Sequence, residues 1–386
     1  MRLLYFVTAL SLISYAQENT SPVLLPVKEE IKQLQIQKSI EKQKVNQYDW
    51  VNDMTLNATQ SKNQTHLKSE EYYLNLSQKI FDFGGITGQI QYSNDLFTQE
   101  LLQIELNHQE DIYLVYENMI QLKLNDIDIL QNNLNLQNSE IEVEIKKSQY
   151  QQGESDISEL NNAIMTRNEL EDSQMQLKLL QVNYENELKK LTSLAIEAIT
   201  LPNIELISKE SFVHNALENQ VAHLESKIAQ SQYKIKKSSY LPSLTLNANY
   251  GYTNSTQNAF DEYYSYGASI SMPLGFTANN DIQHSKLLYL QNKKEEELIK
   301  IQLEKTYETA FETIQQYQRR IELAQRDIAL YNELIELNEE EFNAGFKALE
   351  EVTILKNSKQ IRELDIQKHH LLIQKELYSL YFKVKR

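Results

Sequence analysis

The chain has 386 residues, of which 41% are hydrophobic and 24% charged, and its formal net charge is −16. It contains only 8 glycines and 5 prolines, too few for a fold with many tight turns, so long uninterrupted helices are expected. The acidic balance gives no electrostatic basis for binding nucleic acid. The absence of cysteine excludes disulfides and thiolate metal sites. A mean hydropathy of −0.53 excludes a bundle of membrane helices but leaves a membrane β-barrel open.

The N-terminus has the pattern of a secretory signal peptide. Met1 and Arg2 precede an apolar run over residues 3–13, which ends in Ser14-Tyr15-Ala16. This order predicts a signal peptide over residues 1–16 and export of the remaining chain. The alternative, a membrane anchor, is less favoured because the run is shorter than the ~20 apolar residues that a helical span needs.

The remaining chain is internally duplicated. Thr-Leu-Asn-Ala occurs at 55–58 and again at 245–248, an offset of 190 residues (245 − 55). Tyr150 to Gly153 corresponds to Phe342 to Gly345 at nearly the same offset. Matches that recur in order at one offset indicate a repeat. We therefore divide the chain into repeat one, residues 17–202, and repeat two, residues 203–386.

Each repeat contains a very long stretch without Gly or Pro. The first lies between Gly88 and Gly153 and the second between Gly275 and Gly345. As continuous helices they would be roughly 95–105 Å long. Apolar residues recur every seventh position, which is typical of a coiled-coil seam: Leu106, Tyr113, Ile120, Ile127, Leu134, Ile141, then Tyr307, Ile314, Ile321, Ile328, Ile335 and Phe342. After each lone glycine a second helix is expected to return, so each repeat contains a helical hairpin.

Four short segments alternate between apolar and uncharged polar residues, as half-buried strands do. They are residues 54–59, 72–77, 244–253 and 264–272. They predict one strand pair within 48–83 and another within 241–274, with loops at 60–71 and 254–261. Strands that lack charge and have tyrosines at their ends favour a membrane barrel. The alternative is a small half-buried sheet on a soluble coiled coil.

Four strands cannot close a barrel, because the smallest barrels have about eight. An open sheet edge in lipid is prohibitively costly, so several chains must share one barrel. Two copies would supply eight strands around a filled interior, whereas three would supply twelve around a lumen. The fold class predicted is therefore mainly α with a small β portion, and a shared barrel indicates a conduit.

Three motifs resemble a known family. Tyr240-Leu241-Pro242-Ser243-Leu244 enters a strand, Met272-Pro273-Leu274 ends one, and residues 78–85 lead from a strand to a helix through Phe81-Asp82-Phe83-Gly84-Gly85. Together with the duplication, they resemble TolC-like outer-membrane efflux proteins over residues 28–385. Repeat two departs from the pattern, since it has Gly275-Phe276-Thr277 at the second strand-to-helix turn.

The resemblance implies a homotrimer with a twelve-stranded barrel in outer-membrane lipid and an α-helical tunnel across the periplasm. It also implies that the tunnel docks onto a periplasmic adaptor (a membrane fusion protein) and an inner-membrane transporter. The predicted function is a passive exit duct of a tripartite efflux or type I secretion system. The alternative is a periplasmic coiled-coil adaptor or scaffold without a barrel.

Residue patterns typical of an enzyme are missing from the sequence. Its 7 histidines form no His-Glu-x-x-His array, and it has neither a phosphate-binding glycine loop nor a Gly-x-Ser-x-Gly elbow. We therefore predict no catalytic, cofactor-binding or metal-binding residues.

Two pairs of residues near the hairpin turns are candidate functional residues. Gly153 and Gly345 are expected to take the positive φ that a tight helical turn requires and to present the tips to an adaptor. Glu159 and Glu351 each lie six residues further on. In a trimer they would form an acidic constriction in which mutual repulsion raises their pKa. The simpler interpretation is that both are solvent-exposed residues of a helix tip.

Overall fold

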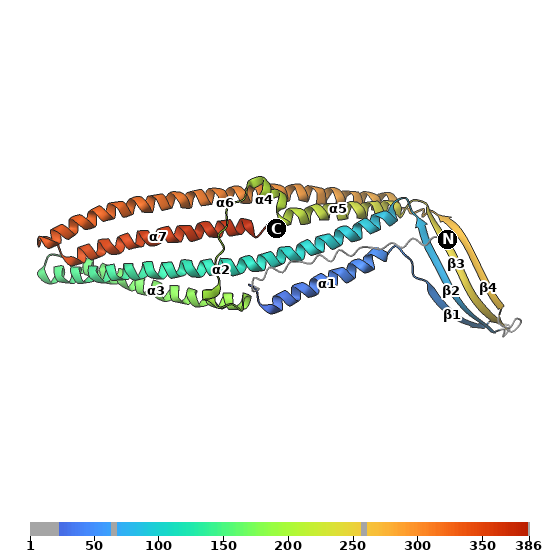
Figure 1. Ribbon diagram of the computed structural model, residues 1–386, viewed down its shortest axis with the longest axis horizontal. Coiled ribbons are helices and arrows are strands. Elements are labelled where there is room, and N and C mark those ends of the chain that lie inside the picture. Colours follow the sequence, from blue (N-terminus) through green and yellow to red (C-terminus); the bar gives the residue numbers. More distant parts are fainter. Residues whose placement is uncertain (1–22, 63–67, 256–260, 385–386) are drawn as a thin grey trace.

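The computed structural model describes residues 23–62, 68–255 and 261–384. The predicted signal peptide, residues 1–16, lies outside this range. The molecule is elongated: helices occupy most of its length and a small sheet forms one end (Figure 1).

Two helical hairpins dominate the fold. In the first, α2 (Gly85–Gln152, 68 residues) is followed by α3 (Ile157–Leu191). In the second, α6 (Ala278–Asn343, 66 residues) is followed by α7 (Leu349–Tyr381). At 1.5 Å per residue, α2 and α6 are each roughly 100 Å long. The prediction of a mainly helical fold with very long hairpins is confirmed.

The other helices lie beside the sheet-proximal halves of α2 and α6. They are α1 (Pro26–Tyr48) and α5 (Leu217–Ser238), with the short α4 (Lys209–Asn215) and a 3₁₀ turn (Ile196–Ala198) in the connecting segment. Contacts follow the order α1–α2–α5–α6 near the sheet and α3–α2–α7–α6 in the other half (Figure 1). Each half is therefore one layer of helices with two open edges.

The sheet contains four antiparallel strands in the order β1-β2-β3-β4. They are β1 (Thr55–Lys62), β2 (Lys68–Phe81), β3 (Ser243–Ser255) and β4 (Asp261–Ser271). The prediction of four strands in two pairs is met, but the predicted loops at 60–71 and 254–261 are wrong in extent. Gln60 pairs with Glu70 and Lys62 with Lys68, because the backbone ladder continues regardless of side-chain polarity. Residues 63–67 and 256–260 lie outside the described chain.

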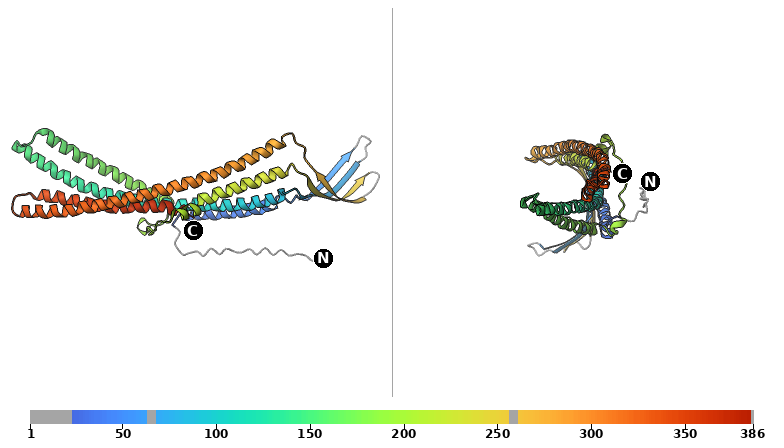
Figure 2. Two further views of the ribbon diagram at one scale, coloured as in Figure 1. Left: turned by 90° about the horizontal axis from the view of Figure 1, so that it is seen from above. Right: turned by 90° about the vertical axis from the view of Figure 1, so that its left-hand side faces the viewer.

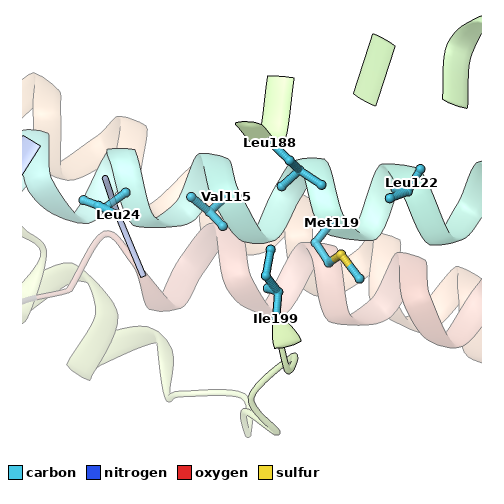
Figure 3. Close-up of a cluster of buried hydrophobic side chains, with 6 residues drawn as sticks. All are labelled: Leu24, Val115, Met119, Leu122, Leu188 and Ile199. Atoms are coloured by element: carbon cyan, nitrogen blue, oxygen red, sulfur yellow. The ribbon is translucent and has the colours of Figure 1, made fainter. Parts of the chain in front are cut away.

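The hydrophobic core is small and lies at mid-length. One cluster joins the N-terminal segment, α2, α3 and the connecting segment (Figure 3), through six side chains: Leu24, Val115, Met119, Leu122, Leu188 and Ile199. A second packs the end of α7 on α2, with Tyr378 and Phe382 against Ile120 and Leu124. The first cluster packs the connecting segment on the first hairpin, and the second fixes the two hairpins to one another.

The two hairpins are joined by polar contacts between α2 and α7. The Lys375 Nζ atom lies 3.0 Å from Glu117 Oε1, and Gln131 Nε2 donates to Asp365 Oδ1 over 2.8 Å. Nearer the tips, Asn357 donates to Asn138 over 2.8 Å. Surface ion pairs contribute at most about 1 kcal/mol each, so this seam orients the hairpins more than it stabilises them.

The first strand-to-helix turn explains the glycine motif of repeat one. Phe83 and Gly84 have φ of 52° and 100°, and Asp82 Oδ1 accepts from the Ile86 N–H at 2.9 Å. A Cβ on Gly85 would lie 2.3 Å from both Asp82 Oδ2 and Ser238 Oγ. Only glycine therefore allows α2 to begin this close to α5.

We predict that Gly85→Ala lowers the free energy of unfolding by about 1–3 kcal/mol, since the added methyl must displace Asp82 or Ser238. Gly267→Ala is the matched control, because nothing lies within 4 Å of its Cβ position. Its expected change is within about 0.5 kcal/mol. Chemical denaturation in detergent, followed by circular dichroism, measures both. Equal midpoints for the two variants would contradict the packing account.

Candidate functional site

One face of the sheet is exposed and, apart from its loop end, apolar. The pairing places Leu56, Leu74, Tyr250 and Tyr264 in one row across the four strands. The neighbouring rows of this face contain Leu76, Ala248, Tyr266, Leu246, Ala268, Leu244 and Ile270. Tyr266 is 84% exposed and Ile270 77%, so no part of the described chain covers this face. An exposed, contiguous apolar face is typical of a surface that contacts a membrane or another protein.

The opposite face is polar, uncharged over most of its length and internally hydrogen-bonded. Asn75 Nδ2 donates to Asn249 Oδ1 over 2.8 Å, and Asn249 Nδ2 donates to Ser265 Oγ over 3.2 Å. One row closer to the helices, Ser77 Oγ donates to Asn247 Oδ1 over 2.8 Å. The sheet therefore separates an apolar side from a side suited to water.

Both edges of the sheet are open in the described chain. β1 pairs only with β2, and β4 pairs only with β3. Because all neighbours are antiparallel, β1 and β4 run in opposite directions. The free edge of β4 can consequently pair with β1 of a second copy and continue the antiparallel order.

The edge helices also carry exposed apolar side chains. On α6, Leu323, Leu330 and Leu337 repeat every seven residues and are 52–56% exposed. The helices of the other edge carry exposed apolar side chains at steps of four and three residues, which fit the same seven-residue repeat: Val27, Ile31 and Leu34 on α1, and Met175, Leu179 and Val182 on α3. Stripes of this spacing are typical of helix–helix contacts.

The two hairpin tips lie at the end opposite the sheet (Figure 2). Gly153 and Gly345 have φ of 76° and 80°, the left-handed conformation that the sequence predicted. The Glu154 N–H donates to the Gln149 carbonyl over 2.9 Å, and the Phe346 N–H donates to the Glu341 carbonyl over 2.9 Å. These are the hydrogen bonds of a glycine-terminated helix. Nothing lies within 4 Å of a Cβ on either glycine, so conformation rather than space requires glycine.

Glu159 and Glu351 are each paired within their own hairpin. The Lys146 Nζ donates to Glu159 Oε2 over 2.8 Å, and the Lys347 Nζ donates to Glu351 Oε2 over 2.7 Å. Hydrogen bonds from Lys146 and then Ser155 lower the pKa of Glu159. Within one chain the direction is thus opposite to the rise that mutual repulsion was expected to cause. Lys347 was visible in the sequence as an i,i+4 partner, whereas Lys146 pairs only across the turn.

Exposed apolar side chains at the tips were not predicted. Phe346 is 83% exposed, and Ile157 and Leu349, which are 58% and 56% exposed, follow the two turns at equivalent positions. The repeat offset relating Ile157 to Leu349 was the available signal. Exposed apolar groups on both tips suit contact with a protein partner.

The described residues include a cavity, but neither a metal-binding cluster nor a membrane-spanning helix. Over 23–62, 68–255 and 261–384, no three His, Cys, Asp or Glu side chains are grouped so as to hold a metal ion. None of the described helices combines the length and apolarity that a membrane crossing requires. One cavity of about 580 Å³ between α2, α5 and α6 includes His223, which lies 3.0 Å from Glu296.

The chain is similar to known outer-membrane proteins in part of its sequence and in its fold. Residues 213–371 match the family described as outer membrane efflux protein. The fold is similar to the outer membrane protein VceC of Vibrio cholerae, with a TM-score of 0.72 and 14% identity over 92% of this chain and 91% of that one. The resemblance to TolC-like outer-membrane efflux proteins is confirmed.

Two further channels of this kind share the fold. The CmeC outer membrane channel of Campylobacter jejuni has a TM-score of 0.67 and 14% identity, covering 93% of this chain and 84% of that one. The MtrE outer membrane channel of Neisseria gonorrhoeae has a TM-score of 0.63 and 12% identity, covering 92% and 85%. No curated protein matches the chain. The TolC-like architecture thus extends over nearly the whole chain at low sequence identity.

We predict that Lys146→Met raises the pKa of Glu159 toward its ordinary value, since the largest cause of its lowering is removed. Because the folded-state pKa is lowered, the ion pair favours the folded tip above the ordinary carboxyl pKa. That contribution is lost as pH falls through the lowered value. A carbon-detected NMR titration of the Glu159 carboxyl measures the change.

Lys147→Met is the control, because it removes the same charge from the adjacent position on another face of α2. It should leave the Glu159 titration nearly unchanged. The same midpoint in wild type and in Lys146→Met would show that the contact is absent in solution.

Proposed function

We propose that this protein is the outer-membrane exit duct of a tripartite export system and acts as a passive conduit across the periplasm and outer membrane. The observation that carries the proposal is the sheet, which has an apolar face, a polar face and two open edges at the end of helices roughly 100 Å long. Its membership of the efflux-type fold supports this assignment.

The open edges support a closed oligomer. In lipid every unpaired backbone group is costly, so β1 and β4 must find partners. Pairing β4 of one copy with β1 of the next retains the antiparallel order around a ring. Three copies would supply twelve strands, enough for a lumen, whereas two would supply the eight of a side-chain-filled barrel. The apolar face then contacts outer-membrane lipid and the polar face lines the duct.

The helical layer closes in the same way. If rotation about one axis relates the copies, the α6 edge of one copy faces the α1 and α3 edge of its neighbour. Near the sheet, Leu298 and Ile301 of α6 would meet the exposed stripe of α1. In the other half, Leu323, Leu330 and Leu337 would meet that of α3. The same rotation between copies thus pairs the open strand edges and covers the exposed apolar stripes.

The tips are proposed to dock onto a periplasmic adaptor, which in turn contacts an inner-membrane transporter that supplies the energy. Exposed Phe346, Ile157 and Leu349 support a protein contact there. Glu159 and Glu351 would place six carboxylates (2 × 3) around the tunnel entrance. Because Lys146 and Lys347 already pair with them, we infer a weaker acidic field than unpaired carboxylates would produce.

A scaffold or adaptor without a barrel is not favoured, since neither role uses a sheet with an exposed apolar face. An enzymatic role is also not proposed, because the exposed apolar sheet face and the exposed tips favour passage and docking instead. The duct is proposed to serve efflux of small compounds or type I secretion, and the attached transporter determines which.

The function is tested by reconstituting the purified protein in a planar lipid bilayer. Stepwise conductance, together with cross-linked species at three times the chain mass, is expected. A detergent-free soluble monomer without conductance would refute the proposal.

We predict that Leu330→Arg destabilises the trimer, because it places a charge in the apolar α6 stripe. Gln325→Arg introduces the same residue on an exposed part of α6 that faces away from this stripe. Light scattering in detergent should give a smaller mass for Leu330→Arg only. A full trimer in Leu330→Arg would remove α6 from the proposed interface.

We predict that Gly345→Val abolishes transport and leaves trimers intact. A β-branched residue at φ of 80° is strained by more than about 1 kcal/mol, so the tip must change shape. Ala344→Val is the matched control, because its φ of −81° accepts valine. Cells expressing each variant are compared for export of a compound that requires the duct. Normal export by Gly345→Val would show that tip shape is unimportant.

A further inference from the structure

One part of the polar sheet face differs in chemistry from the rest. Where other rows consist mainly of Asn, Ser and Thr, the pairing places Tyr73 and Tyr263 on either side of Gly251. The adjacent row, one step nearer the β1–β2 and β3–β4 loops, contains Glu71 and Asp261 on either side of Thr253. We call these two rows the mouth band.

The mouth band is packed tightly. A Cβ on Gly251 would lie 2.6 Å from both the Tyr73 Cβ and the Tyr72 carbonyl oxygen, and Gly251 is buried although it belongs to a surface sheet. Tyr73 and Tyr263 are half-buried, whereas their neighbours on the other face, Tyr72 and Tyr264, are 48% and 73% exposed. Tyr73 and Tyr263, which lie on the polar face, are therefore packed close to the sheet.

A hydrogen bond joins the two rows. The Tyr263 hydroxyl donates to Glu71 Oε1 over 2.5 Å, which holds this carboxylate beside the tyrosine row. The basic residues of the sheet lie elsewhere. By register Lys62 and Lys68 belong to the apolar face, and Lys79 lies at the helix-proximal end of β2, eight residues from Glu71. No lysine or arginine of the described strands shares the mouth band.

We propose that the mouth band determines the charge preference of the duct at its outer end and favours positively charged organic solutes. This inference rests on the proposed trimeric duct, in which the band becomes a ring of six tyrosines and six carboxylates (2 × 3 each). Carboxylates on low-dielectric walls concentrate cations, and tyrosine faces attract organic ammonium groups. The effect extends about 8 Å at physiological ionic strength, so it acts on solutes near the wall.

The sheet offers matched controls, because neighbouring residues face opposite sides. Glu71→Gln with Asp261→Asn removes two charges per copy from the polar face. Glu70→Gln with Glu262→Gln removes two from the opposite face, at the adjacent position of each strand. The K⁺/Cl⁻ and choline/Cl⁻ permeability ratios are measured from reversal potentials in planar bilayers. The double variant of Glu71 and Asp261 should lower both ratios at least about twofold, and the double variant of Glu70 and Glu262 should leave them unchanged.

Tyr263→Phe tests the tyrosine row without altering its size. It removes the hydrogen bond to Glu71 and should lower the choline/Cl⁻ ratio, whereas Tyr264→Phe should not. Each variant is first shown to run as a trimer on a gel without heating. If the wild type conducts but the polar-face variants have the same permeability ratios as the opposite-face variants, the inference is overturned. A wild type without conductance overturns the proposed function instead.

Discussion

The open edges of β1 and β4 are the constraint on which the rest of the structure depends. Each presents a row of backbone N–H and C=O groups that nothing in the described chain satisfies. The strands also carry an exposed apolar face, which is unfavourable in water. Closure with further copies, as proposed above, would resolve both problems, and the antiparallel order of the four strands allows closure by rotation.

The helices of one copy also leave apolar surface exposed at their two edges. A single layer of helices buries little apolar surface, and its clusters lie mainly where the connecting segment crosses at mid-length. Elsewhere α1, α3 and α6 keep apolar stripes exposed at the two edges. The chain is therefore shaped as one segment of a wall rather than as a self-contained domain, which suits a long conduit.

Much of this architecture could be predicted from residue spacing. The glycine-free stretches ending at Gly153 and Gly345 predicted the long helices and their turns, and alternating segments predicted the four strands. Polar residues at 60–62 and 68–71 were assigned to loops because side-chain patterning cannot detect a backbone ladder that continues between polar residues. The environment of Glu159 was also missed, since its partner Lys146 is adjacent only after the hairpin folds.

The sequence by itself determined which helices and strands occur, although not where each strand ends, because helix length, heptad spacing and strand alternation are local properties that backbone geometry imposes on any chain. It also determined the duplication and the glycine turns. Only the tertiary structure decided which strands are neighbours and in what register. Register places Tyr73 beside Gly251 and Glu71 beside Thr253, and these residues are 178 and 182 positions apart (251 − 73 and 253 − 71). Contacts at such separations arise from packing between the repeats, which no local pattern contains.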